Sequence, residues 1–216
     1  MDTKIQKKLH MFFTQFKYHT YNKGEILIRA DDTPAGIFYL KEGLVKEYII
    51  SKKGEELVLN IFKPVSFFPM SWAFNDAPNS YFFEAMNRVE VWRAPKQKVL
   101  DFIKKDNEIL YDLISRTYKG TDGMMKRMAY LMSGGVYVRL LIEILISAKR
   151  FGVIRDNRMV EIEISEKDLA AQSGMTRETV SREIKILKDK NLITFSKNML
   201  IIKNLDQLED VLVQGS

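Results

Sequence analysis

The spacing of apolar residues changes along the chain and predicts different structures in its two halves. Residues 1–20 carry apolar residues at helical spacing among lysines, which predicts a short basic amphipathic helix. From 21 to 95, short runs rich in β-branched and aromatic residues are separated by turn pairs such as Glu42-Gly43 and Lys53-Gly54. The turns recur roughly every 8 to 12 residues, a spacing typical of an antiparallel sandwich or barrel. We therefore expect an antiparallel β-roll of the jelly-roll kind.

After Pro95 the pattern becomes helical. Residues 96–106 predict a short amphipathic helix, and apolar residues then recur every three or four positions over 107–132. A helix of roughly seven turns is longer than most globular helices and suits a helix–helix seam. Gly120 and Gly123 lie in its middle, where each costs about 1 kcal/mol relative to alanine. Either two backbones approach closely there, or the glycines mark a kink.

The segment Ser133-Gly134-Gly135 ends the long helix, and Ser133 is the expected N-cap of the next one. That helix leads into a predicted hairpin around Asp156-Asn157. The expected organisation is a β-roll with its N-terminal helix over 1–106, the long helix over 107–132 and a C-terminal domain over 133–216.

Capping and turn residues define a motif inside the C-terminal domain. Ser165 and Asp168 resemble a capping box that begins one helix, and Gly174 ends it. Thr176 is the expected N-cap of a second helix that runs to about Lys190. Two helices joined by a tight glycine turn make a helix-turn-helix.

The second helix separates into two faces when residues are placed about 100° apart. Its apolar face consists of Val180, Ile184 and Leu187. The polar residues predicted to contact DNA are Thr176, Arg177, Glu178, Thr179, Ser181, Arg182 and Lys185. Arginine can donate two hydrogen bonds to guanine and glutamate can accept one from cytosine, whereas a carboxylate repels phosphates. Because the first turns of this helix enter the major groove in the motif, the face predicts base reading.

Residues 191–204 follow as two β-like runs around a Ser196–Asn198 turn, which predicts a wing with Lys197 at its tip, available to a phosphate. Positive charge gathers on this motif: 174–203 holds seven basic and three acidic residues, whereas 153–216 holds ten and eleven. We interpret 159–203 as a DNA-binding winged helix, with a protein-binding winged helix as the alternative.

Composition excludes several other functions. The 216 residues include no cysteine, so disulfides, cysteine-ligated zinc, iron–sulfur clusters and cysteine nucleophiles are excluded. The two histidines, His10 and His19, are surface residues or a metal-binding pair. The sequence offers no Ser/His/Asp set, metal constellation or Walker-type glycine loop, so we expect no enzyme. With no apolar run of about 20 residues and no signal peptide pattern, we expect a cytoplasmic protein without a membrane partner.

The segments "RETVSREIKILKDKNLI" (177–193), "ISEKDLAAQSG" (164–174) and "IFYLKEG" resemble the Crp/Fnr family of bacterial transcription regulators. The resemblance implies an N-terminal β-roll, a long dimerisation helix and a C-terminal winged helix that bind double-stranded DNA as a homodimer on a palindrome. RNA polymerase is a further candidate partner. Arg177, Glu178 and Arg182 match the base-reading triple of the cyclic-AMP receptor protein, and Ser181 matches the Fnr pattern. Half-sites with a TGA core, either TGTGA-like or TTGA-like, are implied.

The sensor half departs from the family's nucleotide-binding pattern. Members that bind the cyclic nucleotide carry Gly-Glu and Arg-Ser, where this chain has Phe68-Pro69 or Pro69-Met70, and Asn79-Ser80. Without the arginine, a cyclic phosphate would lose its main charge-assisted partner, so we expect no response to cyclic AMP. The family's iron–sulfur and haem sensors need cysteine or a Cys/His ligand set, so neither cofactor is expected. Thr121 does match a nucleotide-contacting threonine of the long helix.

The corresponding stretch of this chain is instead rich in aromatic residues and methionine. The candidate effector residues are Phe68, Met70, Trp72, Tyr81, Phe83 and Thr121. They either line a pocket for an apolar or aromatic small molecule or pack it shut in a regulator that needs no ligand. The alternative to a DNA-binding regulator is a β-roll regulatory or protein-interaction module that senses such a ligand without specific DNA binding. Effector identity and the direction of regulation stay open.

Overall fold

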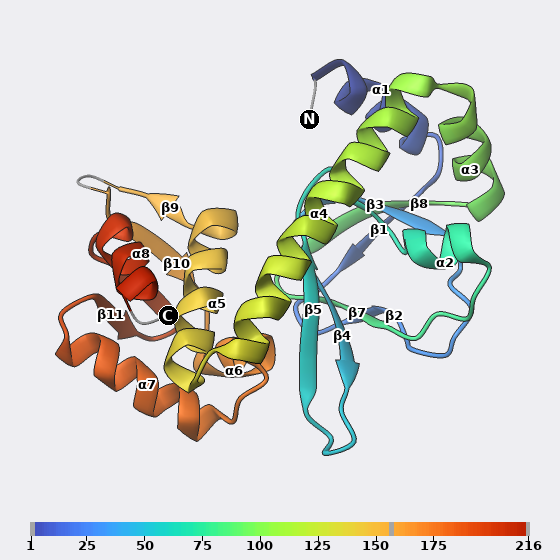
Figure 1. The fold of residues 1–216 in the computed structure, drawn as a ribbon. Helices are drawn as coiled ribbons and strands as arrows, with labels where there is room; N and C mark the ends of the chain where they lie inside the picture. The colour runs from blue at the N-terminus through green and yellow to red at the C-terminus, as the bar shows by residue number, and fades with distance from the viewer. Residues whose placement is uncertain (1–2, 156–157, 215–216) are drawn as a thin grey trace. The chain divides into compact units, whose positions relative to one another are not determined.

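The computed structural model describes residues 3–155 and 158–214, and the chain forms two compact units that divide within a long helix, after Gly120 (Figure 1). The helices are α1 (Thr3–Phe13), α2 (Met70–Asn75), α3 (Lys96–Lys105), α4 (Asn107–Ser133), α5 (Val136–Phe151), α6 (Glu166–Ser173), α7 (Arg177–Asp189) and α8 (Leu205–Gln214). The strands are β1 (Lys17–Tyr21), β2 (Ile26–Ile28), β3 (Ile37–Glu42), β4 (Val45–Ile50), β5 (Glu56–Phe62), β6 (Phe67–Phe68), β7 (Phe82–Ala85), β8 (Val89–Ala94), β9 (Val153–Ile154), β10 (Val160–Glu163), β11 (Ile193–Ser196) and β12 (Met199–Ile202).

The first unit is built on two antiparallel sheets with strand orders β1-β8-β3-β6 and β2-β7-β4-β5. Alternate residues of both sheets point to a shared interior, which Phe38, Phe68, Phe83 and Val91 help to fill. This arrangement confirms the antiparallel β-roll predicted from the turn spacing.

Helices cover the outer face of the sheet that contains β3 and β8. Tyr39 and Trp92 on that face pack with Phe13 of α1, Ile103 of α3 and Ile109 of α4. The sheet is therefore buried on both faces, and the four consecutive residues from Ile37 to Leu40 are all buried for that reason.

Two local expectations were wrong. The N-terminal helix ends at Phe13, because Lys17–Tyr21 pairs along its whole length with β8 and becomes a strand. Ser133 is the last residue of α4, where its hydroxyl donates to the carbonyl of Ala129 at 2.8 Å, so it does not cap α5. Gly135 occupies the N-cap position of α5 and makes no side-chain capping bond.

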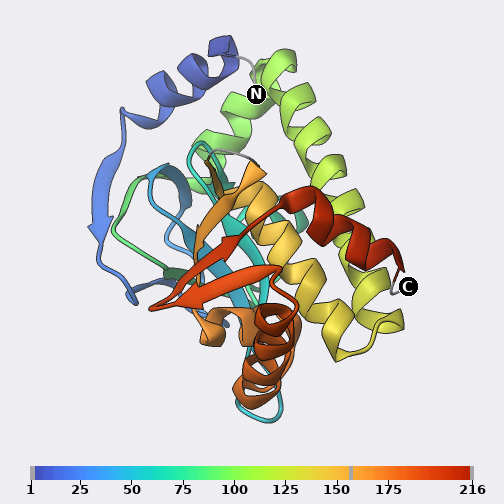
Figure 2. The same cartoon turned by 90° about the vertical axis from the view of Figure 1, so that its left-hand side faces the viewer.

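The second unit packs α5, α6, α7 and α8 with the sheet β11-β12-β10-β9 around one core. Figure 2 looks onto the β11–β12 hairpin, whose strands are drawn in orange and red. The expected turn at 156–157 lies outside the described residues, but β9 and β10 on either side of it pair antiparallel. No helix in the part of the chain that the structure describes is long and apolar enough to cross a bilayer.

Candidate nucleic-acid interface

Helix α6 is fixed at both ends by the residues expected from sequence. The backbone N–H of Asp168 donates to the Ser165 hydroxyl at 3.1 Å, and the N–H of Ser165 donates to the Asp168 carboxylate at 3.0 Å. This reciprocal pair is the predicted capping box. Gly174 takes a left-handed conformation with φ of 63°, and its N–H donates to the carbonyl of Ala170. The chain therefore turns sharply into the next helix, as predicted.

Helix α7 begins at the predicted cap and packs its apolar face inward. The Thr176 side chain accepts a hydrogen bond from the backbone N–H of Thr179 at 3.3 Å. Val180, Ile184 and Leu187 are all buried in the core that α5 and α6 share. The opposite face is therefore held outward by ordinary core packing.

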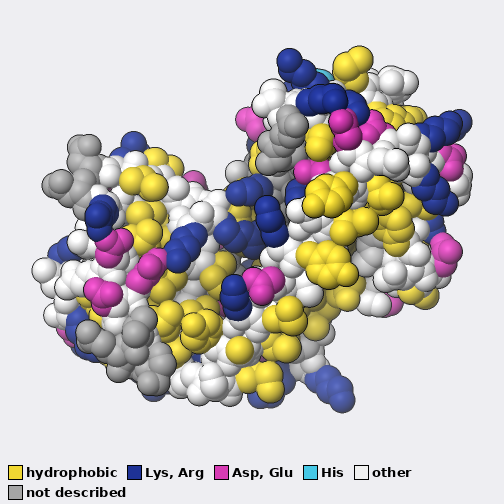
Figure 3. Space-filling model, turned by 45° about the horizontal axis from the view of Figure 1, so that its top comes forward, with side chains coloured by type: hydrophobic (Ala, Val, Ile, Leu, Met, Phe, Trp, Pro, Cys, Tyr) yellow, Lys and Arg dark blue, Asp and Glu magenta, His cyan; other side chains and the backbone are white. Residues whose placement is uncertain are grey.

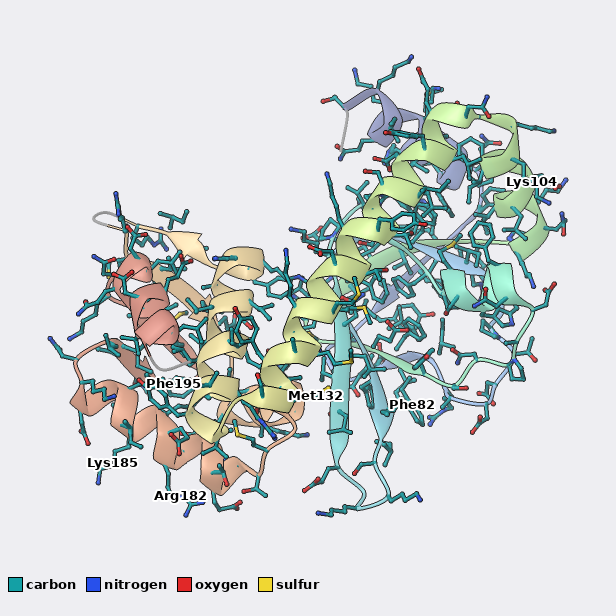
Figure 4. The ribbon with its side chains drawn as sticks, viewed as in Figure 1. Phe82, Lys104, Met132, Arg182, Lys185 and Phe195 are labelled. Carbon is teal, nitrogen blue, oxygen red and sulfur yellow. The ribbon has the colours of Figure 1, made fainter. Side chains whose placement is uncertain are left out.

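The predicted DNA-contacting side chains of α7 lie together on this outward face. Those exposed to solvent are Thr176, Arg177, Glu178, Ser181, Arg182 and Lys185, and Thr179 is partly exposed. Figure 4 shows Arg182 and Lys185 projecting from the same side of α7, away from its core. An arginine and a lysine thus reach outward one turn apart, a spacing suited to contacts along one groove.

Weak contacts orient the two arginines without burying them. Arg182 Nη2 donates to the Thr179 hydroxyl at 3.3 Å, and that hydroxyl lies 3.1 Å from the Thr176 hydroxyl. Arg177 Nε lies 3.7 Å from a carboxylate oxygen of Glu166 on α6, and the Arg177 side chain is 72% exposed. Exposed ion pairs of this kind contribute little to stability, so both guanidinium groups can exchange these partners for base edges.

Glu178 keeps its negative charge at the start of α7. A hydrogen bond from its own backbone N–H, followed by one from Thr176, lowers the pKa of the Glu178 carboxyl below its usual value. The unpaired N–H groups at a helix start favour a negative charge at this position. The carboxylate is therefore ionised near neutral pH and ready to accept a hydrogen bond.

The wing follows directly from α7. Strands β11 and β12 pair from Ile193↔Ile202 to Ser196↔Met199, which leaves Lys197 and Asn198 as the two turn residues. Both have positive φ, 47° and 66°, as a two-residue hairpin of type I′ requires. Lys197 is exposed at the tip, where the sequence predicted it.

The structure divides the candidate effector residues between different cores. Phe68, Phe83 and Tyr81 belong to the interior of the β-roll. Met70 and Trp72 pack with the helices on the outer side of the sheet, and Lys96 Nζ lies 4.8 Å from the centre of the Trp72 ring. Thr121 is exposed and belongs to the second unit. These six residues therefore do not line one surface of the first unit.

Four phenylalanines fill the interior of the roll. Phe68 stacks on Phe83 with ring centres 5.2 Å apart and lies 4.9 Å from Phe62 and 5.9 Å from Phe38. Phe68 is fully buried and Phe83 is 1% exposed. Rings at these distances are in van der Waals contact with one another.

The position expected to lack a phosphate-binding arginine has a structural role instead. Asn79 is 3% exposed, and its amide donates to the carbonyls of Arg29 at 2.9 Å and Tyr81 at 2.8 Å. Because both donors of the amide are used within the fold, Asn79 holds two loops together.

One polar group in the roll was missed by the sequence analysis. Glu47 lies opposite Phe83 in the β4–β7 register and two residues after buried Val45, so it is on the inward face of its sheet. Burial raises the pKa of the Glu47 carboxyl to about 7. Period-2 alternation along Val45, Glu47 and Ile49 was the available signal.

A depression of about 490 Å³ lies elsewhere in the first unit, between α2 and α3. Phe74, Leu100, Lys96 and Lys104 contribute to its lining. None of the six candidate effector residues, all of them within the described range, contributes to this lining. Of the two histidines, His10 lies on α1 with its ring 5.0 Å from that of Trp92, and His19 lies on β1 opposite Val91 of β8.

Family comparisons agree with this geometry in both units. Residues 18–106 match the cyclic nucleotide-binding domain, and residues 138–211 match the Crp-like helix-turn-helix domain. The chain belongs to the Crp/Fnr family of transcription regulators. It is thus a DNA-binding transcription regulator and not an enzyme, as the sequence predicted.

Known members of the family align with most of this chain. The cAMP-activated global transcriptional regulator CRP of Pasteurella multocida is 23% identical over 202 residues, covering 92% of this chain and 95% of that protein. The global nitrogen regulator of Synechocystis sp. is 25% identical over 192 residues, covering 86% and 84%.

Among solved structures, a CRP/FNR-family transcriptional regulator from Thermus thermophilus matches with a TM-score of 0.76 at 22% identity, covering 93% of this chain and 100% of the other. The c-di-GMP responsive global regulator CLP of Xanthomonas campestris matches with a TM-score of 0.80 at 18% identity, covering 91% and 98%. These matches confirm the fold of β-roll, long helix and winged helix.

Proposed function

We propose that the regulator binds, as a homodimer, a palindrome whose half-sites contain a TGA core, and that it does so without cyclic AMP. The observation that carries the proposal is the outward face at the start of α7, where Arg177, Glu178 and Arg182 are exposed together on a rigid, capped helix. Two guanidinium groups and one carboxylate can read G·C and C·G edges in the major groove.

The long helix supports the dimer. Exposed side chains recur along α4 at alternating steps of three and four residues: Tyr111, Ile114, Tyr118, Thr121, Met125, Met128 and Met132. Most of this row is apolar, and a row of that period is the seam of a two-stranded coiled coil. Figure 3 shows that apolar side chains, in yellow, lie among charged ones on the face of the molecule that it draws.

Two glycines of α4, Gly120 and Gly123, lie off this row, at the heptad positions that face away from such a seam. A Cβ added to Gly120 or Gly123 would meet no atom of the described chain within 4 Å. The proposed seam therefore does not explain the two glycines, although alanine in the middle of a helix would stabilise it by about 1 kcal/mol.

Independence from cyclic AMP is supported by the stacked phenylalanines and by Asn79. The roll interior holds Phe38, Phe62, Phe68 and Phe83 in mutual contact, and both amide donors of Asn79 bond to backbone carbonyls. A nucleotide would have to displace this packing and would find no arginine in place of Asn79 for its phosphate. We propose a roll that is packed shut and needs no iron–sulfur cluster or haem, with RNA polymerase still a candidate partner of the bound dimer.

Selection of bound fragments from a random DNA library tests the whole proposal. The expected product is an inverted repeat with TGA in each half, recovered equally well with and without cyclic AMP. Gel shifts on that repeat should give nanomolar affinity that falls steeply as salt rises. Recovery of no common sequence would instead favour the ligand-sensing β-roll module without specific DNA binding.

A further inference from the structure

The last part of α4, from Thr121 on, packs against the rest of the second unit through very few side chains. Of residues 121–133, all of which the structure describes, only Arg127 and Leu131 are less than exposed. The seam residues Met125 and Met128 flank Arg127 in sequence and are 54% and 56% exposed. Arg127 therefore points away from the seam, into the unit that carries α7.

Arg127 joins three helices. Its Nε donates to the carboxylate of Glu143 on α5 at 2.5 Å, and its Nη2 donates to the backbone carbonyl of Gln172 on α6 at 2.5 Å. The Gln172 side chain in turn accepts a hydrogen bond from the Ser147 hydroxyl of α5 at 3.1 Å. The guanidinium thus bonds at once to the first helix of the domain and to the first helix of the helix-turn-helix.

The contact between Arg127 and its partners is buried, so the geometry of its hydrogen bonds is restricted. Glu143 and Ser147 are each 2% exposed and Gln172 is 7% exposed, while the Arg127 side chain retains 18%. Burial raises the pKa of the Glu143 carboxyl, and Arg127 acts against that rise by stabilising the charged form. Away from water, a charged pair with two fixed acceptors tolerates only a narrow range of helix orientations.

The contact lies close in sequence to the reading helix. Gln172 precedes Gly174 by two residues, and α7 begins three residues after that glycine. Arg127 itself lies on α4, the helix that carries the proposed dimer seam. A change in the angle between α4 and α6 would therefore change where a dimer holds its two α7 helices.

We propose that Arg127 is a positioning residue that fixes the angle between the dimer seam and the reading helix, and through it the half-site spacing that the dimer accepts. This inference rests on the proposed homodimer that binds a palindrome. It predicts a role in the geometry of binding for a residue that contacts neither DNA nor the partner helix.

The test measures binding of the full-length protein to palindromes whose half-sites are moved apart or together one base pair at a time, and to a duplex with a single half-site. Two variants are compared with wild type: Arg127→Gln, and the double variant Arg127→Leu/Glu143→Leu, which leaves no unpaired buried charge. Arg155→Gln is the matched control, because Arg155 pairs with Glu161 at 2.9 Å on the exposed surface of the same unit. Sedimentation confirms that each is a dimer.

Wild type and Arg155→Gln should prefer one spacing by about tenfold or more over its neighbours, since each base pair rotates one half-site relative to the other. Both Arg127 variants should lose most of that preference while binding the single half-site as wild type does. Equal losses on palindrome and half-site would mean a purely structural role and would overturn the inference, as would an unchanged spacing preference in the double variant. If wild type itself shows no spacing preference, the proposed palindrome fails and the inference fails with it.

Discussion

In the winged helix the charged side chains of α7 project from a capped helix into solvent, whereas in the β-roll one phenylalanine from each of β3, β5, β6 and β7 turns inward and packs against the others: Phe38, Phe62, Phe68 and Phe83. In both regions, core packing sets the direction in which these side chains point. The outward face of α7 can present polar groups to a partner, whereas the interior of the β-roll holds few polar groups between its packed rings. The face of α7 thus presents charged side chains to solvent, whereas Phe68 and Phe83 are buried inside the roll.

The contrast between the two regions bears on how DNA binding is controlled. The first unit matches a cyclic nucleotide-binding domain, and the regulator that we propose holds stacked phenylalanines rather than a nucleotide inside its roll. Control of DNA binding in such a chain would then act through the long helix and its contacts with the winged helix. Substitutions in the interior of the roll and on the DNA-contacting surface test this contrast.

Replacing Phe68 with alanine should have the largest effect. Loss of a fully buried ring that contacts three other phenylalanines should lower the free energy of unfolding of the β-roll by about 3–5 kcal/mol, measured by urea denaturation. The apolar cavity should bind benzene or indole and recover part of the lost Tm. Phe74→Ala, at a 49% exposed position in the same stretch, is the control and should change little. Wild type that already binds such probes would show that its interior is open.

Replacing Glu47 with glutamine should stabilise the protein at alkaline pH. Because burial raises the folded-state pKa to about 7 from an ordinary 4.5, the folded state holds a proton that the unfolded state releases between these values. The contribution of Glu47 to wild-type stability should therefore be most favourable below pH 4.5 and fall as pH rises to about 7. At pH 8, Glu47→Gln should be more stable by about 3 kcal/mol, and at pH 4 the two should agree. Glu55→Gln, in an exposed turn, should show no such pH dependence.

Replacing Arg182 with alanine should cost about 1–3 kcal/mol of DNA-binding free energy and relax the preference at one G·C pair. Affinities for the parent palindrome and for variants changed at each position, measured by fluorescence anisotropy, would locate that pair. An operator preference that survives the change intact would mean that α7 docks in another way.

Replacing Lys197 with alanine should have the smallest effect. A lysine at the wing tip that meets a phosphate contributes equally to every sequence, so all affinities should weaken by a similar factor. The slope of log affinity against log salt should become shallower by about one. A change confined to one base position would assign Lys197 to base reading instead.

The reading face could be predicted from sequence because each of its determinants is local. Ser165 with Asp168, Gly174 and Thr176 act over three or four residues, and the two-residue turn at Lys197 is equally short-range. Helical period then assigns Val180 and Arg182 to opposite faces without knowledge of any other segment. The structure placed all of these residues where the sequence predicted.

The roll interior and the Arg127 contact could not be predicted in the same way. Whether Phe68 faces Phe83 or the helices depends on its register with β3, a strand far from it in the chain. Met70 and Trp72, only a few residues from Phe68, turned to another core. Nothing in the local pattern of α4 distinguishes Arg127 from its other polar residues, because the partners of Arg127 lie 16 and 45 residues away.

The most direct test of the account is the affinity of the untreated, full-length protein for its selected palindrome, measured by fluorescence anisotropy in the absence and presence of cyclic AMP. The account predicts nanomolar binding without any added ligand, steep weakening as salt rises, and the same dissociation constant within about twofold when cyclic AMP is added. Binding that appears only with cyclic AMP, or that tightens by about tenfold or more, would contradict it.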